Sequence, residues 1–137
     1  MLPRVLIVDD HDDFRKAVKL HLEGADLELE IYEASTAEMA VAKAACIKPV
    51  IVLMDINLPG ANGFAALSEI KRDSPACDVI ILSMFEAEAV RNMVKESQAK
   101  DFIGKSEVFE CLVPALRKCL KNRDVGNHNN RKRRMAK

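Results

Sequence analysis

The chain has 137 residues, 49% of them hydrophobic and only 4% aromatic, so it has the length of one ordinary domain with an aliphatic core. No apolar run approaches the roughly 18 to 20 residues of a membrane-spanning helix, and no signal peptide precedes the first apolar segment, so we expect a cytoplasmic protein without membrane contact. The formal net charge of zero hides an asymmetry: residues 1–120 hold 14 Lys and Arg against 20 Asp and Glu, whereas residues 121–137 hold 7 against 1.

The first strand and helix are predicted at the start of the chain. Residues 4–8 (Arg-Val-Leu-Ile-Val) are a nearly continuous apolar run that ends in two carboxylates, Asp9 and Asp10. Apolar residues then recur with helical spacing, which predicts a helix from about Asp13 to Glu23. Its acidic first turn suits the positive end of a helix dipole.

A strand at a sheet edge and a second helix follow. Leu29 and Ile31 alternate with polar neighbours, the pattern of a strand with one polar face. Next, Ser35-Thr36-Ala37-Glu38 fits a capping box that opens an alanine-rich helix through Ala45.

The central strand is residues 50–54 (Val-Ile-Val-Leu-Met), which are all apolar and mostly β-branched. This pattern indicates a strand buried on both faces in a parallel sheet. The strand ends on Asp55, and Pro59-Gly60 then predicts a turn. A carboxylate directly after a buried strand is costly unless it is hydrated, paired or bound to a metal.

The second half of the chain continues the alternation of helix and strand, which predicts five strands and five helices in all. The remaining elements are a helix capped by Asn62 that runs from Gly63 to about Arg72, a strand at 79–82 that ends on Ser83, a helix at 86–96, a short strand at Phe102-Ile103 followed by Lys105, and a last helix from about Ser106 to Leu120. Pro114 lies inside this last helix and removes one backbone hydrogen bond.

This alternation predicts an α/β fold with a doubly wound, five-stranded parallel sheet. We adopt the order 2-1-3-4-5 from the flavodoxin-like folds, because the alternation does not by itself fix the order of the strands. In that order the first and third strands are neighbours, so Asp9, Asp10 and Asp55 converge at one edge, and Ser83 and Lys105 line the same edge. Crowded carboxylates repel one another unless they hold protons or bind a cation, and oxygen ligands favour Mg²⁺. Asp55 could then act as a nucleophile on a phosphoryl group.

Each of these residues also has an ordinary structural interpretation. Asp55 could be a strand terminator that reaches solvent, and Asp9 and Asp10 could cap the next helix. Ser83 could be a strand-end hydroxyl, and Lys105 could be a solvated charge. Their joint placement at successive strand ends favours a common site. The four cysteines show no metal-binding spacing, and we interpret them as reduced thiols: Cys46, Cys77, Cys111 and Cys119.

Four stretches resemble the receiver domain of two-component response regulators, especially the receivers that precede LuxR-type DNA-binding domains. They are Leu6-Ile7-Val8-Asp9-Asp10-His11, residues 54–63 (Met-Asp-Ile-Asn-Leu-Pro-Gly-Ala-Asn-Gly), Leu82-Ser83-Met84 and Phe102-Ile103-Gly104-Lys105-Ser106. The resemblance covers about residues 4–120, and the signature positions of the family occur in order.

The resemblance implies that Asp55 accepts a phosphoryl group from a histidine kinase or phosphotransfer protein, with Mg²⁺ as cofactor. It also implies that the metal ligands are Asp9, Asp10, Asp55 and the carbonyl oxygen of Asn57, that Lys105 contacts the phosphate, and that Ser83 and Phe102 form a switch pair. Such a domain phosphorylates and dephosphorylates itself but is not a dedicated enzyme.

Two features depart from the family pattern. Ser97-Gln98-Ala99 stands where the family usually has a glycine before its fifth strand, so that helix needs a looser or different ending. In addition, the residues after Leu120 are too few for a helix-turn-helix domain. We therefore assign residues 1–122 to the receiver domain and 123–137 to a basic, disordered tail or linker remnant, whose binding to nucleic acid would be weak and sequence-independent.

Three functional interpretations remain. The first is a stand-alone receiver that switches a protein-interaction surface and could form a homodimer. The second is the receiver part of a LuxR-type transcriptional regulator cut off in its linker. The third is an Mg²⁺-dependent phosphohydrolase of the haloacid-dehalogenase type, but such enzymes carry a second Asp where this chain has Asn57.

Overall fold

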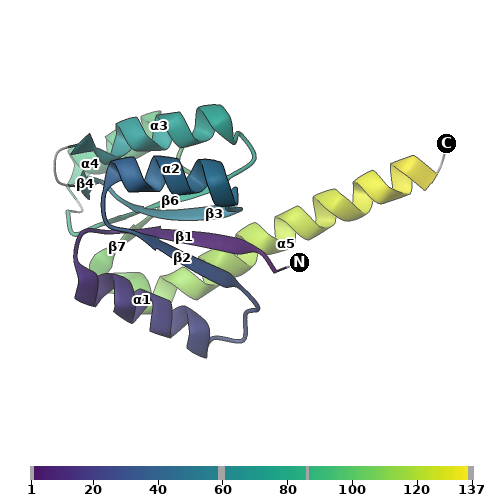
Figure 1. The fold of residues 1–137 in the computed structure, drawn as a ribbon, viewed down its shortest axis with the longest axis horizontal. Helices are drawn as coiled ribbons and strands as arrows, with labels where there is room; N and C mark the ends of the chain where they lie inside the picture. Colours follow the sequence, from purple (N-terminus) through teal and green to yellow (C-terminus); the bar gives the residue numbers. More distant parts are fainter. Residues whose placement is uncertain (1, 59–60, 86, 136–137) are drawn as a thin grey trace.

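A five-stranded parallel sheet forms the centre of the protein, with the strand order β2-β1-β3-β6-β7. The computed structural model describes residues 2–58, 61–85 and 87–135 (Figure 1). The strands of this sheet are β1 (Arg4–Val8), β2 (Glu30–Ala34), β3 (Ile51–Asp55), β6 (Asp78–Ser83) and β7 (Asp101–Gly104). This is the predicted order 2-1-3-4-5, because β6 and β7 are the fourth and fifth strands of the sheet.

Helices cover both faces of the sheet (Figure 1). The helices α1 (Asp12–Gly24) and α5 (Val108–Met135) lie on one face, and α2 (Ala37–Ile47), α3 (Gly63–Asp73) and α4 (Glu88–Glu96) lie on the other. All five residues of β3 are buried, and they alternate between the two cores: Val52 and Met54 pack with α2 and α3, whereas Ile51 and Leu53 pack with α1 and α5. The all-apolar run therefore encodes a strand that is covered on both sides.

Two helix starts test the capping predictions. Asn62 caps α3 as predicted, since its side chain accepts a hydrogen bond from the Phe64 N–H at 2.9 Å. For α2 the cap is Thr36 rather than Ser35, because the Thr36 hydroxyl accepts from the Met39 N–H at 3.1 Å. The predicted capping box was therefore wrong by one residue, and Glu38 lies in the first turn instead of closing the box.

The end of α4 shows how this chain does without the usual glycine. The Ser97 hydroxyl donates to the Val94 carbonyl at 2.6 Å and accepts from the Ala99 N–H at 3.1 Å. Ser97 has φ −86°, so the helix ends with an extended residue and avoids the left-handed conformation that favours glycine. The predicted start of α4 at Glu86 lies outside the described residues.

A short antiparallel pair that the sequence did not predict follows β3. It consists of β4 (Asn57–Leu58) and β5 (Ala61–Asn62), with Asn57 opposite Asn62. The predicted turn at residues 59–60 lies outside the described residues. The pair leads the chain back toward the end of β3, where α3 begins.

The last helix differs from the prediction at both ends. A 3-10 turn (η1, Lys105–Glu107) precedes α5, which then continues through Pro114 to Met135. Residues 123–135 therefore have helical backbone where the sequence predicts a disordered tail. The packed half of α5 explains the difference, because extending an existing helix costs much less than nucleating one.

Arg123 connects this last helix to the body of the domain. Its guanidinium donates to the carbonyl oxygens of Val50, at 3.0 Å, and Ala76, and it lies 3.6 Å from Asp78. The sequence assigned Arg123 to the tail, and the structure shows it in contact with Val50, Ala76 and Asp78. A boundary after residue 123 is thus our revised proposal.

Candidate functional site

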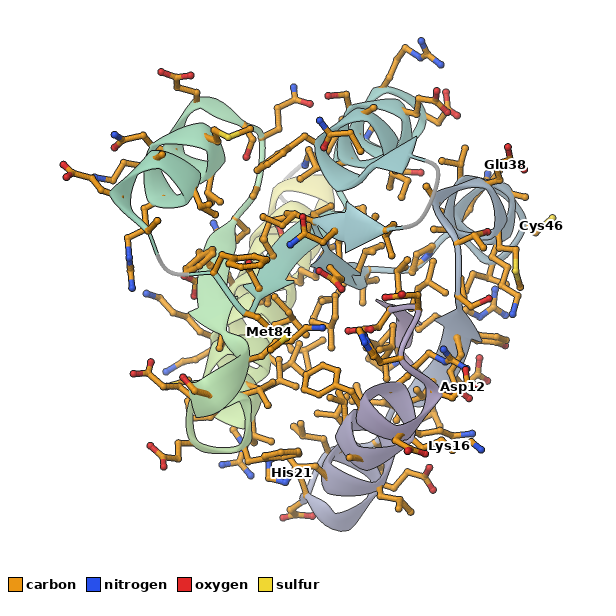
Figure 2. All side chains as sticks on the ribbon, turned by 90° about the vertical axis from the view of Figure 1, so that its left-hand side faces the viewer. Asp12, Lys16, His21, Glu38, Cys46 and Met84 are labelled. Carbon is orange, nitrogen blue, oxygen red and sulfur yellow. The ribbon has the colours of Figure 1, made fainter. Side chains whose placement is uncertain are left out.

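The carboxyl ends of the strands bring the predicted site residues to one edge of the sheet. Asp9 follows β1, Asp55 ends β3 and Ser83 ends β6; they are 1%, 4% and 0% exposed. Figure 2 shows this edge of the molecule, with Asp12 at the start of α1 and Met84 after β6. A buried carboxylate pair at this edge needs a positive partner.

Lys105 provides that partner within the protein. Its Nζ lies 2.7 Å from Asp9 Oδ2 and 3.2 Å from Asp55 Oδ2, so one ammonium bridges the two strands. The same Nζ lies 4.5 Å from the centre of the Phe14 ring. Only 10% of the Lys105 side chain is exposed, which fixes the ammonium between the carboxylates.

The two buried carboxylates are held in the same way. Asp9 Oδ1 accepts from the His11 N–H at 2.9 Å, and Asp55 Oδ1 accepts from the Asn57 N–H at 3.0 Å. In each aspartate one carboxylate oxygen thus accepts the N–H of the residue two positions later and fixes the local turn. The other oxygen faces Lys105.

Burial and charge shift the pKa values of these groups. Burial raises the pKa of Asp55, and the neighbouring Asp9 charge adds to this, against the effects of the Asn57 N–H and Lys105. Burial acts against the charged form of Lys105, but its hydrogen bonds and ion pairs with Asp9 and Asp55 outweigh that effect and raise the pKa of Lys105. The ammonium therefore stays charged at neutral pH.

The oxygen atoms at this edge suit a hard divalent cation. Ligand atoms of Asp9, Asp10, His11 and Asp55 all lie within 4.8 Å of one another. Asp10 Oδ1 is buried and accepts no hydrogen bond from the described residues. Because Mg²⁺ prefers carboxylate and carbonyl oxygens, the donors fit this ion. His11 was not among the predicted ligands, and its Nδ1 lies 3.3 Å from Asp10 Oδ1.

The two predicted switch residues each contact a residue outside the acidic cluster. The Ser83 hydroxyl accepts from the Phe85 N–H at 3.0 Å. Phe102 is half-buried on β7, where the Arg91 guanidinium lies 5.1 Å from the centre of its ring. Each side chain is thus engaged by a neighbour of its own in this state.

Gly63 is a residue of the site that sequence reasoning missed. A Cβ atom at this position would lie 2.7 Å from the Asp55 carbonyl oxygen and 2.7 Å from Ile56 Cα. The Gly63 N–H also donates to the Ile56 carbonyl at 3.2 Å. Glycine thus allows the start of α3 to pack directly on the backbone that carries Asp55. Only its place after the Asn62 cap could have drawn attention to it.

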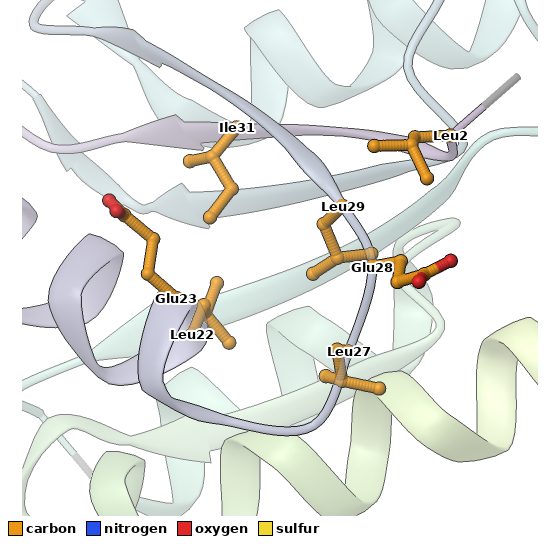
Figure 3. Close-up of a pocket in the computed structure, with 7 residues that line it drawn as sticks. All are labelled: Leu2, Leu22, Glu23, Leu27, Glu28, Leu29 and Ile31. Carbon is orange, nitrogen blue, oxygen red and sulfur yellow. The ribbon is translucent and has the colours of Figure 1, made fainter.

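A pocket at the other end of the sheet has a different character. It has a volume of about 430 Å³ and is lined by Leu2, Leu22, Glu23, Leu27, Glu28, Leu29 and Ile31 (Figure 3). These lining residues are apolar or acidic, so they offer no positive charge for binding a phosphate. The edge that carries Asp55 and Lys105 is therefore the candidate site.

Comparisons with known proteins agree with this geometry. The family described as response regulator receiver domain matches residues 5–117. The chain is 37% identical to the chemotaxis protein CheY of Thermotoga maritima over 118 residues, which are 86% of this chain and 98% of that protein. It is 30% identical to the response regulator GacA of Pseudomonas protegens over 114 residues, which are 83% of this chain and 54% of that protein.

Solved structures show the same relationship. The crystal structure of a LuxR-family two-component response regulator from Aurantimonas sp. SI85-9A1 superposes with a TM-score of 0.80 at 28% identity, over 89% of this chain and 87% of that one. The chain therefore belongs to the receiver domain family of two-component response regulators. It spans about half the length of the GacA relatives. Receiver domains of response regulators are not dedicated enzymes. Among the described residues, no helix is long and apolar enough to cross a membrane.

Proposed function

We propose that Asp55 is the phosphoacceptor of this receiver domain. The observation that carries the proposal is the bridge from Lys105 to Asp55 and Asp9, because it combines a buried carboxylate with a fixed cation at the end of the central strand. The Asn57 N–H holds one Asp55 oxygen and so orients the carboxylate. A nucleophile for phosphoryl transfer needs this combination of positioning and charge stabilisation.

In the proposed reaction an Asp55 oxygen forms a bond to phosphorus while the bond from phosphorus to the donor atom breaks, and the leaving group keeps the electron pair. Asp9, Asp10, Asp55 and the Asn57 carbonyl oxygen would hold Mg²⁺, which supplies positive charge to the carboxylates and the phosphoryl oxygens when bound. Lys105 donates a hydrogen bond to a phosphoryl oxygen, and the Ser83 hydroxyl leaves the Phe85 N–H to donate to another.

Labelling with a small phosphodonor tests the phosphoacceptor. With acetyl phosphate and Mg²⁺, we expect one acid-labile phosphate on the wild-type chain and none on Asp55→Asn, as measured by intact-protein mass spectrometry. Asp13→Asn is a matched control, since Asp13 is an exposed aspartate of the first turn of α1. Equal labelling of Asp55→Asn and the wild type would contradict the assignment, and chelation of Mg²⁺ should abolish labelling of the wild type.

A second experiment separates phosphorylation from response. We propose that Ser83 and Phe102 couple the phosphate to the surface formed by α4, β7 and α5. Ser83→Ala should accept phosphate but lose the phosphate-dependent amide shifts of residues 88–120 in NMR spectra. Unchanged shifts in this variant would show that another residue couples the site to that surface.

The donor and the output follow from the family. We propose a cytoplasmic histidine kinase or phosphotransfer protein as donor, and a protein contact as output. The match to nearly the full length of CheY favours a stand-alone receiver. The match to about half of GacA supports the alternative, in which the chain is the receiver part of a longer, LuxR-type regulator. Sequencing of the complete reading frame decides between them.

A further inference from the structure

Arg15, on the first full turn of α1, holds the acidic turn after β1 in place. Its Nη1 donates to the Asp9 carbonyl oxygen at 2.7 Å, its Nε pairs with Glu33 at 2.9 Å, and its Nη2 pairs with Asp12 at 2.5 Å. Only 12% of its side chain is exposed. One planar guanidinium therefore joins the turn to α1 and to β2, and no point-charge side chain can reproduce its fork of donors.

Glu33 is itself held from several sides. Lys19 lies 3.7 Å from its carboxylate, and the Lys43 ammonium donates to its carbonyl oxygen. The Asp9 N–H donates to the carbonyl oxygen of the next residue, Ala34, at 3.1 Å. The turn thus rests on the end of β2 through its backbone and through the pair of Arg15 and Glu33.

The opposite end of the same two strands carries an arrangement of the same kind. Arg4 pairs with Glu30 of β2 at 3.0 Å and donates to the Ile47 carbonyl oxygen at 3.0 Å. Both arginines thus join β2 to a backbone carbonyl, but only Arg15 holds a carbonyl that belongs to the acidic cluster. This provides a matched internal control.

We propose that Arg15, supported by Glu33, is a positioning residue that sets the affinity of the acidic cluster for Mg²⁺. The inference rests on the proposed function, since it assumes that Asp9, Asp10 and Asp55 bind the ion. Through the Asp9 carbonyl, Arg15 fixes the backbone from which the Asp9 and Asp10 side chains project. The Asp10 carboxylate, whose buried Oδ1 accepts no hydrogen bond from the described residues, is thereby kept within 4.8 Å of the other ligand atoms.

Two effects of Arg15 on Mg²⁺ affinity oppose each other. Its positive charge repels the ion, whereas its hydrogen bonds preorganise the ligands. Asp12 and Glu33 neutralise the charge at 2.5 and 2.9 Å, so we expect preorganisation to dominate. Loss of residues that orient metal ligands typically weakens metal binding by about 10- to 100-fold.

A charge-neutral double substitution isolates the preorganisation. Arg15→Met with Glu33→Gln removes one positive and one negative charge and the hydrogen bond to the Asp9 carbonyl. Arg4→Met with Glu30→Gln makes the same chemical change at the other end of β1 and β2. Mg²⁺ would be titrated into each full-length chain and followed by the amide NMR shifts of residues 9–11 and 55–57, with thermal unfolding measured in parallel.

We expect both double variants to lose stability, but only the pair at Arg15 to lose about tenfold in Mg²⁺ affinity, with the Arg4 pair within about twofold of wild type. Arg15→Lys keeps the charge but loses the fork of donors, so its Mg²⁺ affinity should lie between those of the two double variants. This single variant provides the test if the double variant at Arg15 does not fold. Unchanged or tighter Mg²⁺ binding, or equal losses in both pairs, would overturn the inference. A wild-type chain that binds no Mg²⁺ would overturn the proposed metal site and this inference together.

Discussion

Substitution of Gly63 by alanine should destabilise the protein, although alanine is the better helix former. A Cβ atom at position 63 would lie 2.7 Å from both the Asp55 carbonyl oxygen and Ile56 Cα, so backbone atoms must move apart. Crowding of this kind costs about 1–3 kcal/mol, and the helix propensity of alanine returns up to about 1 kcal/mol. Because both close contacts are with backbone atoms, which cannot turn aside as a side chain could, we expect a crowding cost of roughly 2–3 kcal/mol. The net loss is then about 1–2 kcal/mol, which corresponds to a melting temperature lower by roughly 3–8 °C for a domain of this size.

Gly24→Ala is the matched control for this experiment. Gly24 is the last residue of α1, and apart from its chain neighbours and the backbone of its own helix turn no atom of the described residues lies within 4 Å of the position of its Cβ. Alanine there should stabilise the protein by up to about 1 kcal/mol, so the two substitutions should have opposite signs in thermal unfolding followed by circular dichroism. Because the crowded atoms belong to Asp55 and Ile56, Gly63→Ala should also weaken Mg²⁺ binding. A Gly63→Ala variant as stable as the wild type would refute the close packing of α3 on the end of β3.

Three further predictions concern thiols, pH and the last helix. At pH 8 a thiol reagent should modify the exposed Cys46 and Cys111 quickly, whereas burial raises the pKa of Cys77 to about 11 and should leave it unmodified until the protein unfolds. Burial also raises the pKa of Asp55 in the folded protein. The stability that the neutral carboxyl group contributes is therefore fully present below the pKa of the unfolded state, and it is lost as the pH rises through the pKa of the folded state. Without Mg²⁺, the melting temperature of Asp55→Asn relative to that of the wild type should therefore increase between pH 4 and pH 7. Deletion of residues 124–137 should leave the melting temperature nearly unchanged. Deletion of residues 123–137 also removes the contacts of Arg123 with Val50, Ala76 and Asp78, and should lower the free energy of unfolding by about 1–3 kcal/mol. Equal losses of stability in both deletions would argue against an anchoring role for Arg123.

The strands could be predicted because hydrophobic pattern is a property of the sequence at short range, whereas their order was adopted from known flavodoxin-like folds and agrees with the structure. Residues 50–54 form a buried run, and β3 proved to be buried on both faces. The convergence of Asp9 and Asp55 then followed from the parallel order alone. The unpredicted parts depend on contacts between segments that are distant in sequence. The close packing of Gly63 on Asp55 and the contacts of Arg123 with Val50 are two such cases.

Local ambiguity explains the smaller errors. Ser35 and Thr36 are both good caps, and the sequence cannot show which hydroxyl faces a free N–H. In the structure the cap is Thr36, whose hydroxyl accepts a hydrogen bond from the Met39 N–H. At the end of α4 the resemblance to the family indicated that the usual glycine is missing. Only the geometry shows that the Ser97 hydroxyl ends the helix instead, through its hydrogen bonds with Val94 and Ala99. Arg15 was overlooked because its role depends on three acceptors that helix periodicity does not reveal.

The charge balance of the cluster suggests why phosphorylation would change the structure. By formal charge, Asp9, Asp10 and Asp55 with Lys105 give the cluster two negative charges in excess, which one divalent cation neutralises. On the proposed function, phosphorylation replaces the single charge of Asp55 by about −1.5 to −2, so the neutralised cluster becomes negative again. The Ser83 hydroxyl lies at this edge of the sheet and has a proton to donate, and in this structure it accepts a hydrogen bond from the Phe85 N–H. If the Ser83 side chain rotated to donate to the phosphate, the Phe85 N–H would lose this acceptor. The segment that leads into α4 would then be free to move, so the added negative charge would change the surface near α4.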